Sequence, residues 1–278
     1  MVQQMILQDF AKRYATRIGA SAGYLEQLLV FTKRLPWRVE EITTDMVDDY
    51  LTDALATLAP NTVANHRRML TTLMTEARRL GLNTCIVERF RRVKVPTPIP
   101  VAWSLTEIKH LVEAARKTHG QFRDLKKSMF LEAWFLTAYA TGLRSGDLTE
   151  IRWDQVRGRR LYVGQSKTSI PHVAVFTDEA LSACRALPKR RRIFGDYAAL
   201  NTIQQWVADC VERAEMSGAT KTLRKSCATY AKVKGMSPKA KLGHRTEGLA
   251  ERHYVDQMLY EEECGLNGEP LPSVLSQS

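Results

Sequence analysis

The side chains best suited to chemistry lie towards the C-terminus, between Lys221 and Tyr254. This mainly helical stretch contains Arg224, His244 and Tyr254, and Arg144 stands far upstream in a Thr-Gly-Leu-Arg segment. Two guanidinium groups, an imidazole and a phenol suit an enzyme that attacks a phosphodiester with a tyrosine oxygen and stabilises the charge without a metal ion. The pattern therefore indicates covalent chemistry on a phosphodiester.

Length and charge agree with a nucleic-acid substrate. The chain has 278 residues, which is long for a single core and suits two domains of ordinary size. Its formal net charge of +11 favours a polyanionic partner. No lysine-rich helix with a bulky apolar face stands out, so the charge predicts nucleic acid in preference to a membrane surface.

The cysteines and the N-terminus bear on the compartment. The five cysteines are scattered and include no Cys-x-x-Cys pair, which argues against a disulfide framework or a zinc site. No basic segment followed by an apolar one opens the chain, and the longest apolar run, from Ala133 to Leu143, is too short to cross a bilayer. We expect a soluble, cytoplasmic protein.

Residues 1–95 are predicted to form a helical, DNA-binding domain. Apolar residues recur at helical spacing from Ser21 to about Leu80, and Gly81 ends the last helix. Basic residues of this domain are candidate DNA contacts: Arg67, Arg68, Arg78, Arg79, Arg91, Arg92 and Lys94. The alternative for the four helical arginines is an ordinary solvated surface.

Residues 96–103 are predicted to be a linker, and residues 104–278 a second domain that ends in a polar tail, 265–278. Pro96, Pro98 and Pro100 exclude a continuous helix and favour an extended segment that lies across a phosphate backbone. Ser104 and Glu107 form a capping box that opens the second domain.

The second domain is predicted to be helical with one β-hairpin, so the fold class is mainly α with a small β-sheet. Two strands flank a turn with Lys167 at its tip. The predicted segments are a buried helix from Met129 to about Tyr139, strands Arg160–Val163 and His172–Phe176, and helices Asn201–Met216, Leu223–Lys234 and Leu249 to about Glu263.

At Arg144, Lys167, Arg224, His244 and Tyr254, in that order, the sequence resembles the tyrosine recombinases, also called the phage integrase family. The resemblance covers nearly the whole chain. It implies that residues 1–95 form the family's helical core-binding, SAM-like domain. It also implies that residues 104–278 form the catalytic domain, with the fold of the DNA breaking-rejoining enzymes. Singly, each motif has an ordinary structural explanation, such as a turn into a helix or a half-buried tyrosine, so the resemblance depends on their conjunction.

The chemistry explains the residue types in this pattern. Negative charge grows on the non-bridging oxygens of a phosphodiester under attack, and a guanidinium can bind two such oxygens without losing its proton. We assign this role to Arg144 and Arg224, and a further hydrogen bond to His244. Tyr254 is the candidate nucleophile, because a phosphotyrosine link keeps the bond energy for rejoining. Neither ATP, a metal nor another cofactor is then required.

The resemblance implies two further roles and shows two departures. It implies that Lys167 is the general acid for the leaving 5′ oxygen and that Asp147 orients the cations without reacting. Where the family usually has histidine, three residues before the second arginine, this chain has Lys221. We expect Lys221 to donate to a phosphate oxygen; acting as a base would require the neutral form, which burial favours. The interval from His244 to Tyr254 is one residue longer than the commonest family spacing.

The leading hypothesis is a site-specific DNA recombinase or integrase that forms a 3′-phosphotyrosine intermediate. Its implied partners are double-stranded DNA and three further copies in a tetrameric synapse, with the monomer in solution left open and accessory DNA-bending or directionality proteins as optional partners. We expect the tail, through Leu271, Val274 and Leu275, to dock on a neighbouring subunit. The alternatives are a catalytically impaired, recombinase-like DNA-binding protein, favoured by Lys221, and a topoisomerase-like monomer.

Overall fold

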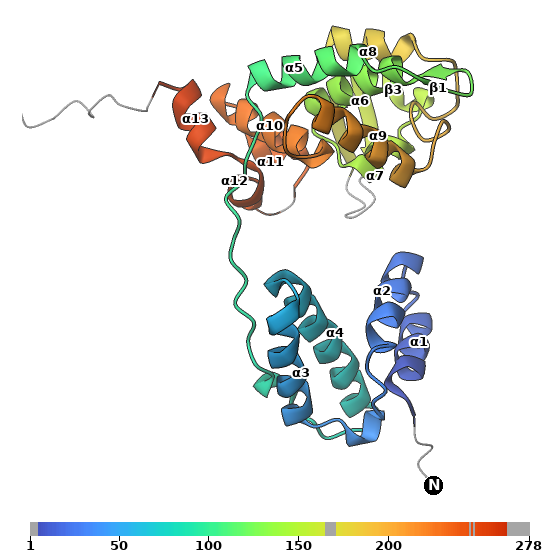
Figure 1. Cartoon of the computed structure of the whole chain (residues 1–278), viewed down its shortest axis with the longest axis vertical. Coiled ribbons are helices and arrows are strands. Elements are labelled where there is room, and N and C mark those ends of the chain that lie inside the picture. Colours follow the sequence, from blue (N-terminus) through green and yellow to red (C-terminus); the bar gives the residue numbers. More distant parts are fainter. Residues whose placement is uncertain (1–4, 165–170, 245, 247, 266–278) are drawn as a thin grey trace, which may run out of the picture. The chain divides into compact units, whose positions relative to one another are not determined.

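The computed structural model describes residues 5–164, 171–244, 246 and 248–265. Lys167 and the tail residues Leu271, Val274 and Leu275 lie outside the described residues. The chain divides into two compact units, Met1–Pro98 and Ile99–Ser278 (Figure 1). In the described part of the chain, no helix is both long enough and apolar enough to cross a bilayer.

The first unit is helical. Thr43 caps helix α3 by accepting from the backbone of Met46, and Pro60 occupies the first turn of α4, where its missing N–H costs nothing. The apolar faces of the helices share one core, which includes Leu7, Leu28 and Leu70. The elements are α1 (Leu7–Arg17), α2 (Ala22–Thr32), η1 (Val39–Glu41), α3 (Thr44–Thr57), α4 (Pro60–Arg79) and η2 (Val87–Arg89). Helix α1 was not predicted.

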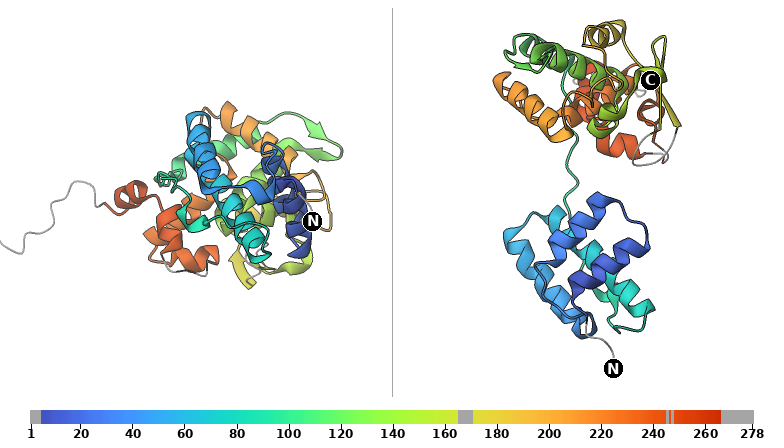
Figure 2. Two further views of the ribbon diagram at one scale, coloured as in Figure 1. Left: turned by 90° about the horizontal axis from the view of Figure 1, so that it is seen from below. Right: turned by 90° about the vertical axis from the view of Figure 1, so that its right-hand side faces the viewer.

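The second unit is mainly helical and contains all the strands named here (Figure 2). Strands β3, β4 and β5 form one antiparallel sheet, and β1 and β2 form a separate hairpin. The helices are α5 (Leu105–Arg116), α6 (Lys127–Thr141), α7 (Ser145–Glu150), η3 (Trp153–Gln155), α8 (Asp178–Arg185), α9 (Leu200–Arg213), α10 (Thr220–Val233), α11 (Pro238–Leu242), α12 (Leu249–Tyr254) and α13 (Gln257–Glu263). The strands are β1 (Gln121–Phe122), β2 (Leu125–Lys126), β3 (Val156–Arg157), β4 (Arg160–Gly164) and β5 (Pro171–Val175).

Helix α6 is the centre of the second unit. Phe130, Trp134 and Phe135 on this helix are fully buried, and α6 packs against α5, α8 and α10. Aromatic edges meet there: the Phe130 and Phe194 rings are 5.5 Å apart and nearly perpendicular. Helix α6 is thereby held in the core of the second unit, and its C-terminal end leads to Arg144.

Two sequence predictions need correction at the level of elements. The single helix predicted from Leu249 to Glu263 is two helices, because Val255 and Asp256 adopt extended backbone and Asp256 caps α13. Tyr254 is therefore the last residue of a short helix. Trp103, predicted as part of the linker, is 3% exposed and packs in the core of the second unit.

Candidate active site

Gly142 ends helix α6 and brings it close to α10 and α11. Its φ of +64° is left-handed, and a Cβ there would lie 2.7 Å from Leu242 Cδ2 and 2.9 Å from Cys227 Sγ. Only glycine fits this position without displacing its neighbours. The Gly142 carbonyl consequently accepts a hydrogen bond from the Arg224 guanidinium.

Arg224 is buried on α10 and held by several acceptors. Its Nη2 donates to the Leu242 carbonyl (3.4 Å) and to His244 Nε2 (2.8 Å). Burial lowers the pKa of Arg224 and the nearby Arg144 cation lowers it further, whereas Tyr254 raises it. A guanidinium stays protonated under all these influences. The site therefore contains a fixed, buried positive charge.

His244 follows Gly243, which ends α11 with a left-handed φ of +65°. His244 is buried, with 8% of its surface exposed. Burial, then the Arg224 and Arg144 cations, lower the pKa of His244 to about 4, so the ring is neutral at pH 7. Because a guanidinium can only donate, Nε2 is the acceptor and the proton lies on Nδ1. Nδ1 has no hydrogen-bond partner among the described residues. The ring thus presents an unused donor.

Tyr254 completes this group. Its ring centroid lies 5.0 Å from that of His244 and 5.0 Å from Arg224 Cζ. Helix α12 ends at this residue, and the side chain is half-buried. Helix α10, the turn after α11 and the end of α12 therefore bring a guanidinium, an imidazole and a phenol into contact.

Arg144 is the N-cap residue of α7, and its side chain is 26% exposed. Its Nη1 lies 3.6 Å from Oδ2 of the buried Asp147. Its charge lowers the pKa of both Arg224 and His244, so it lies within electrostatic reach of both. Asp147 thus lies beside the Arg144 cation, and its orienting role stays a prediction.

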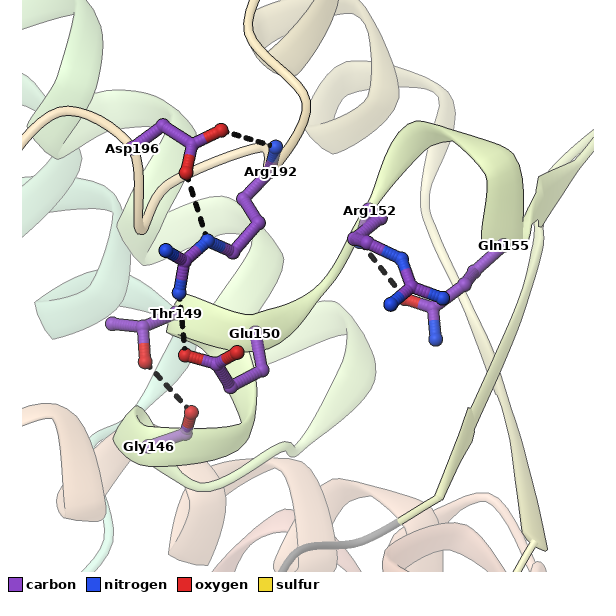
Figure 3. Close-up of polar contacts among 7 residues, drawn as sticks. All are labelled: Gly146, Thr149, Glu150, Arg152, Gln155, Arg192 and Asp196. Atoms are coloured by element: carbon purple, nitrogen blue, oxygen red, sulfur yellow. Dashed lines mark hydrogen bonds and ion pairs between the residues drawn. The ribbon is translucent and has the colours of Figure 1, made fainter.

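The C-terminal end of α7 is tied to the loop that follows α8 (Figure 3). Arg192 donates to Glu150 on α7 and to Asp196, each at 2.8 Å. Gly195 approaches so closely that a Cβ would lie 2.1 Å from the Thr149 carbonyl. Arg192 therefore helps to position the helix that Arg144 begins.

His172 and Lys241 are two further polar residues near the site that the sequence analysis missed. His172, on β5, is 9% exposed, and its Nε2 has no hydrogen-bond partner among the described residues. Burial, then Arg224 and Lys241, lower the pKa of His172, while Asp147 raises it. Strand alternation places His172 on the same face as Ala174 and Phe176, so a polar residue at a core position was the available signal.

Lys221 is exposed on the first turn of α10, one turn before Lys225. Burial and Lys221 lower the pKa of Lys225. Lys221 is not buried, and its role as a phosphate donor stays a prediction. Among the described residues, no cluster of His, Cys, Asp and Glu could hold a metal ion.

The candidate DNA contacts of the first unit differ in their surroundings. Arg67 donates to the Phe90 and Arg91 carbonyls, and so holds the chain after η2 against α4. Arg79 binds both oxygens of Glu76, at 2.7 and 2.9 Å. Further contacts join Arg78 to Glu88, Arg68 to Asn65 and Arg91 to Thr52, whereas Arg92 and Lys94 are exposed.

Comparison with known proteins identifies the family. The model of the family described as "Phage integrase family" matches residues 104–261, which is more than half of the chain. The chain belongs to the phage integrase family. The predicted family and fold class are confirmed. A search of curated proteins finds no significant match.

Solved structures agree in fold with this phage integrase family member. A lambda integrase dimer bound to a COC' core site is 20% identical with a TM-score of 0.73, over 91% of this chain and 78% of that one. The Tn1549 transposon integrase in complex with circular intermediate DNA is 12% identical with a TM-score of 0.68, over 90% and 95%. XerH recombinase bound to a palindromic difH substrate is 16% identical with a TM-score of 0.67, over 95% and 84%.

Proposed function

We propose that this chain is a site-specific DNA recombinase that cleaves and rejoins DNA through a 3′-phosphotyrosine intermediate. The observation that carries the proposal is the contact of the Tyr254 ring with both Arg224 and His244, with Arg144 within electrostatic reach. Family membership supports the reaction class.

In this proposal the Tyr254 oxygen attacks the scissile phosphorus and the bond from phosphorus to the 5′ oxygen breaks. Arg144 and Arg224 stabilise the charge on the non-bridging oxygens, and the free Nδ1–H of His244 donates to one of them. The leaving 5′ oxygen takes up a proton, for which Lys167 is the candidate donor. A 5′ hydroxyl of another strand then attacks the phosphotyrosine and releases the Tyr254 phenol. In both cleavage and rejoining, one phosphate ester bond forms as another breaks.

We further propose that the substrate is duplex DNA and that four copies act together. The structural neighbours include lambda integrase as a dimer on a core site and as a tetramer bound to a Holliday junction. The net charge of +11 suits such a polyanion. Arg92 and Lys94, exposed near the C-terminal end of the first unit, are the candidate phosphate contacts least engaged with other described residues.

A covalent capture experiment with DNA of random sequence tests the proposal and identifies the target at the same time. The purified chain is incubated with a pool of nicked random duplexes, the mixture is denatured with SDS, and protein-linked DNA is recovered and sequenced. We expect the wild-type chain and Tyr260→Phe to retain DNA of a common sequence, and Tyr254→Phe to retain none. Tyr260 is a matched control because its ring packs on Lys232, 4.2 Å from Nζ, on α10.

Other outcomes would favour the alternatives. If the wild-type chain shifts DNA in a gel but forms no adduct, the catalytically impaired binding protein is the better description. If it relaxes supercoiled DNA at low concentration without paired sites, it acts as a monomeric topoisomerase. An adduct with Tyr254→Phe would refute the assigned nucleophile.

A further inference from the structure

Asp256, two residues after Tyr254, is a buried carboxylate with more partners than a helix cap needs. It is 7% exposed and lies in the break between α12 and α13. Oδ1 accepts from the Leu259 N–H at 3.2 Å, the usual bond of an N-cap residue. Oδ2 accepts from the Ala102 N–H at 2.7 Å, across 154 residues of sequence. The second bond adds nothing to the cap.

The backbone of Asp256 is held as well. Its N–H donates to Thr229 Oγ1 at 2.9 Å, and Thr229 is fully buried on α10, the helix that carries Arg224. The Lys225 cation lies within electrostatic reach of the carboxylate, because Asp256 raises the pKa of Lys225 against the larger lowering effects of burial and Lys221. One residue therefore joins three segments: the start of the second unit, α10 and α13.

The segment that includes Ala102 has a second anchor beside the first. Ala102 lies four residues after Pro98, the last residue of the first unit. The next residue, Trp103, donates its N–H to Ser226 Oγ on α10 at 2.8 Å. Successive N–H groups thus bind the two elements that hold the candidate catalytic groups: Trp103 binds the helix of Arg224, and Ala102 binds the carboxylate next to Tyr254.

Helix α12 packs against α10 and α11, but among the described residues it is short and little buried. It spans six residues, its N-cap Gly248 makes no side-chain cap, and Ala250 is its one buried residue. Besides the contacts of its ring with His244 and Arg224, the position of Tyr254 at the C-terminal end of α12 depends on the two residues after it, through the burial of Val255 and the bonds of Asp256.

We propose that Asp256 is a positioning residue that fixes Tyr254 for attack and links its position to residue 102, where the chain enters the second unit. The proposal rests on the proposed function of Tyr254 as nucleophile. It assigns to the Ala102–Asp256 bond a role in the placement of the phenol as well as in the stability of the unit.

Four variants separate placement from stability. Ala102→Pro removes the N–H donor and leaves Asp256 and the α13 cap in place, while Asp256→Ala removes both side-chain bonds. Asp256→Asn keeps one acceptor oxygen. Ser226→Ala is the matched control, because it removes the neighbouring anchor of the same segment, the bond from the Trp103 N–H, without touching the residues after Tyr254.

The first readout is amide hydrogen exchange of the free full-length protein. We expect faster exchange in α12 for Ala102→Pro and Asp256→Ala, and wild-type exchange there for Ser226→Ala. This readout does not require catalysis, so the proposal stays testable if the chain forms no covalent adduct. Unchanged exchange in α12 of Ala102→Pro would overturn it.

The second readout is the single-turnover rate of adduct formation on a captured duplex, with DNA affinity measured by gel shift. We expect Ala102→Pro and Asp256→Ala to slow adduct formation by roughly tenfold or more at unchanged affinity, because small displacements of a nucleophile are costly. Asp256→Asn should recover part of the rate. Equal slowing by Ser226→Ala would show a merely structural role. An adduct with Tyr254→Phe would instead refute the nucleophile assignment.

Discussion

The guanidinium of Arg224 is fixed by protein acceptors before any substrate is present. The Gly142 and Leu242 carbonyls and His244 Nε2 hold it, while its Nε has no partner among the described residues. A charged group fixed in this way needs little reorganisation when negative charge develops beside it. The same bonds make His244 an acceptor at Nε2, so the arginine also sets the tautomer that carries its proton on Nδ1.

The lowered pKa of His244 predicts a pH-dependent stability. The folded-state pKa is about 4, below the ordinary value of 6.5, so the unfolded chain binds more protons between these values. Stability should therefore fall as the pH decreases from about 6.5 to 4, by at most about 3 kcal/mol from this residue. His244→Gln should lose that part of the dependence in urea unfolding between these pH values. Part of the pH dependence should remain in this variant, because the pKa of His172 is also lowered. Identical pH profiles would contradict the prediction.

Gly142→Ala should destabilise the chain and misplace Arg224. The left-handed φ and the contacts of a Cβ with Leu242 and Cys227 together predict a loss of roughly 2–5 kcal/mol in the free energy of unfolding. Gly146→Ala is the matched control, since a Cβ there meets nothing within 4 Å, and its stability should stay within about 1 kcal/mol of the wild type. Urea unfolding measures both. A similar loss in both variants would contradict this explanation.

Candidate site residues can be chosen from the sequence where a motif contains them. They cannot be chosen where only the fold brings them near the site. Arg144, Arg224, His244 and Tyr254 could be chosen from the sequence because their chemistry and order match one reaction. His172 could not, because nothing in a β-strand pattern reveals that its ring lies near the charges of Arg224 and Lys241.

At the scale of elements, α7 is short and depends on its attachment to the loop after α8. Arg192→Met should remove the ion pairs to Glu150 and Asp196 and lower the free energy of unfolding by about 1 kcal/mol, because the pairs are partly exposed. Amide exchange in α7 should become faster. Arg191→Met is the control, since Arg191 is exposed and lies in the same loop, directly before Arg192. Equal effects of the two variants would show that the attachment does not hold α7.

The helices themselves were largely predictable, because apolar spacing and caps report on local structure. Helix α10 and strands β4 and β5 lie close to their predicted ranges. The break at Val255 and Asp256 was missed, because helical periodicity continues across it. The cause of the break is tertiary: the Asp256 carboxylate binds Ala102, and its N–H binds Thr229. Likewise, Trp103 follows a proline-rich segment but is buried by contacts that its own sequence does not show.

At the scale of the whole molecule, positive charge is abundant but unequally available. Arg79 binds Glu76, and this hydrogen bond is the main cause that lowers the Glu76 pKa to about 2. Arg67 is engaged with backbone carbonyls. Arg92 and Lys94 are exposed near the C-terminal end of the first unit. From the sequence, all these cations are equal candidates for DNA contacts. In the structure, Arg67 and Arg79 already bind other groups of the protein.

This difference predicts an unequal salt dependence of DNA binding. Releasing counterions makes log K fall linearly with log salt, with a slope of about −0.9 for each phosphate contact. Arg92→Gln and Lys94→Gln should each reduce the slope by roughly 1 and weaken binding similarly for all sequences. Arg79→Gln should leave the slope nearly unchanged, because its guanidinium already satisfies Glu76. Gel-shift titrations on one duplex between about 50 and 200 mM salt measure the slopes. If Arg79→Gln reduces the slope as much as Lys94→Gln does, the ion-paired arginines of α4 contact DNA after all, and the partition between structural and DNA-binding cations is wrong.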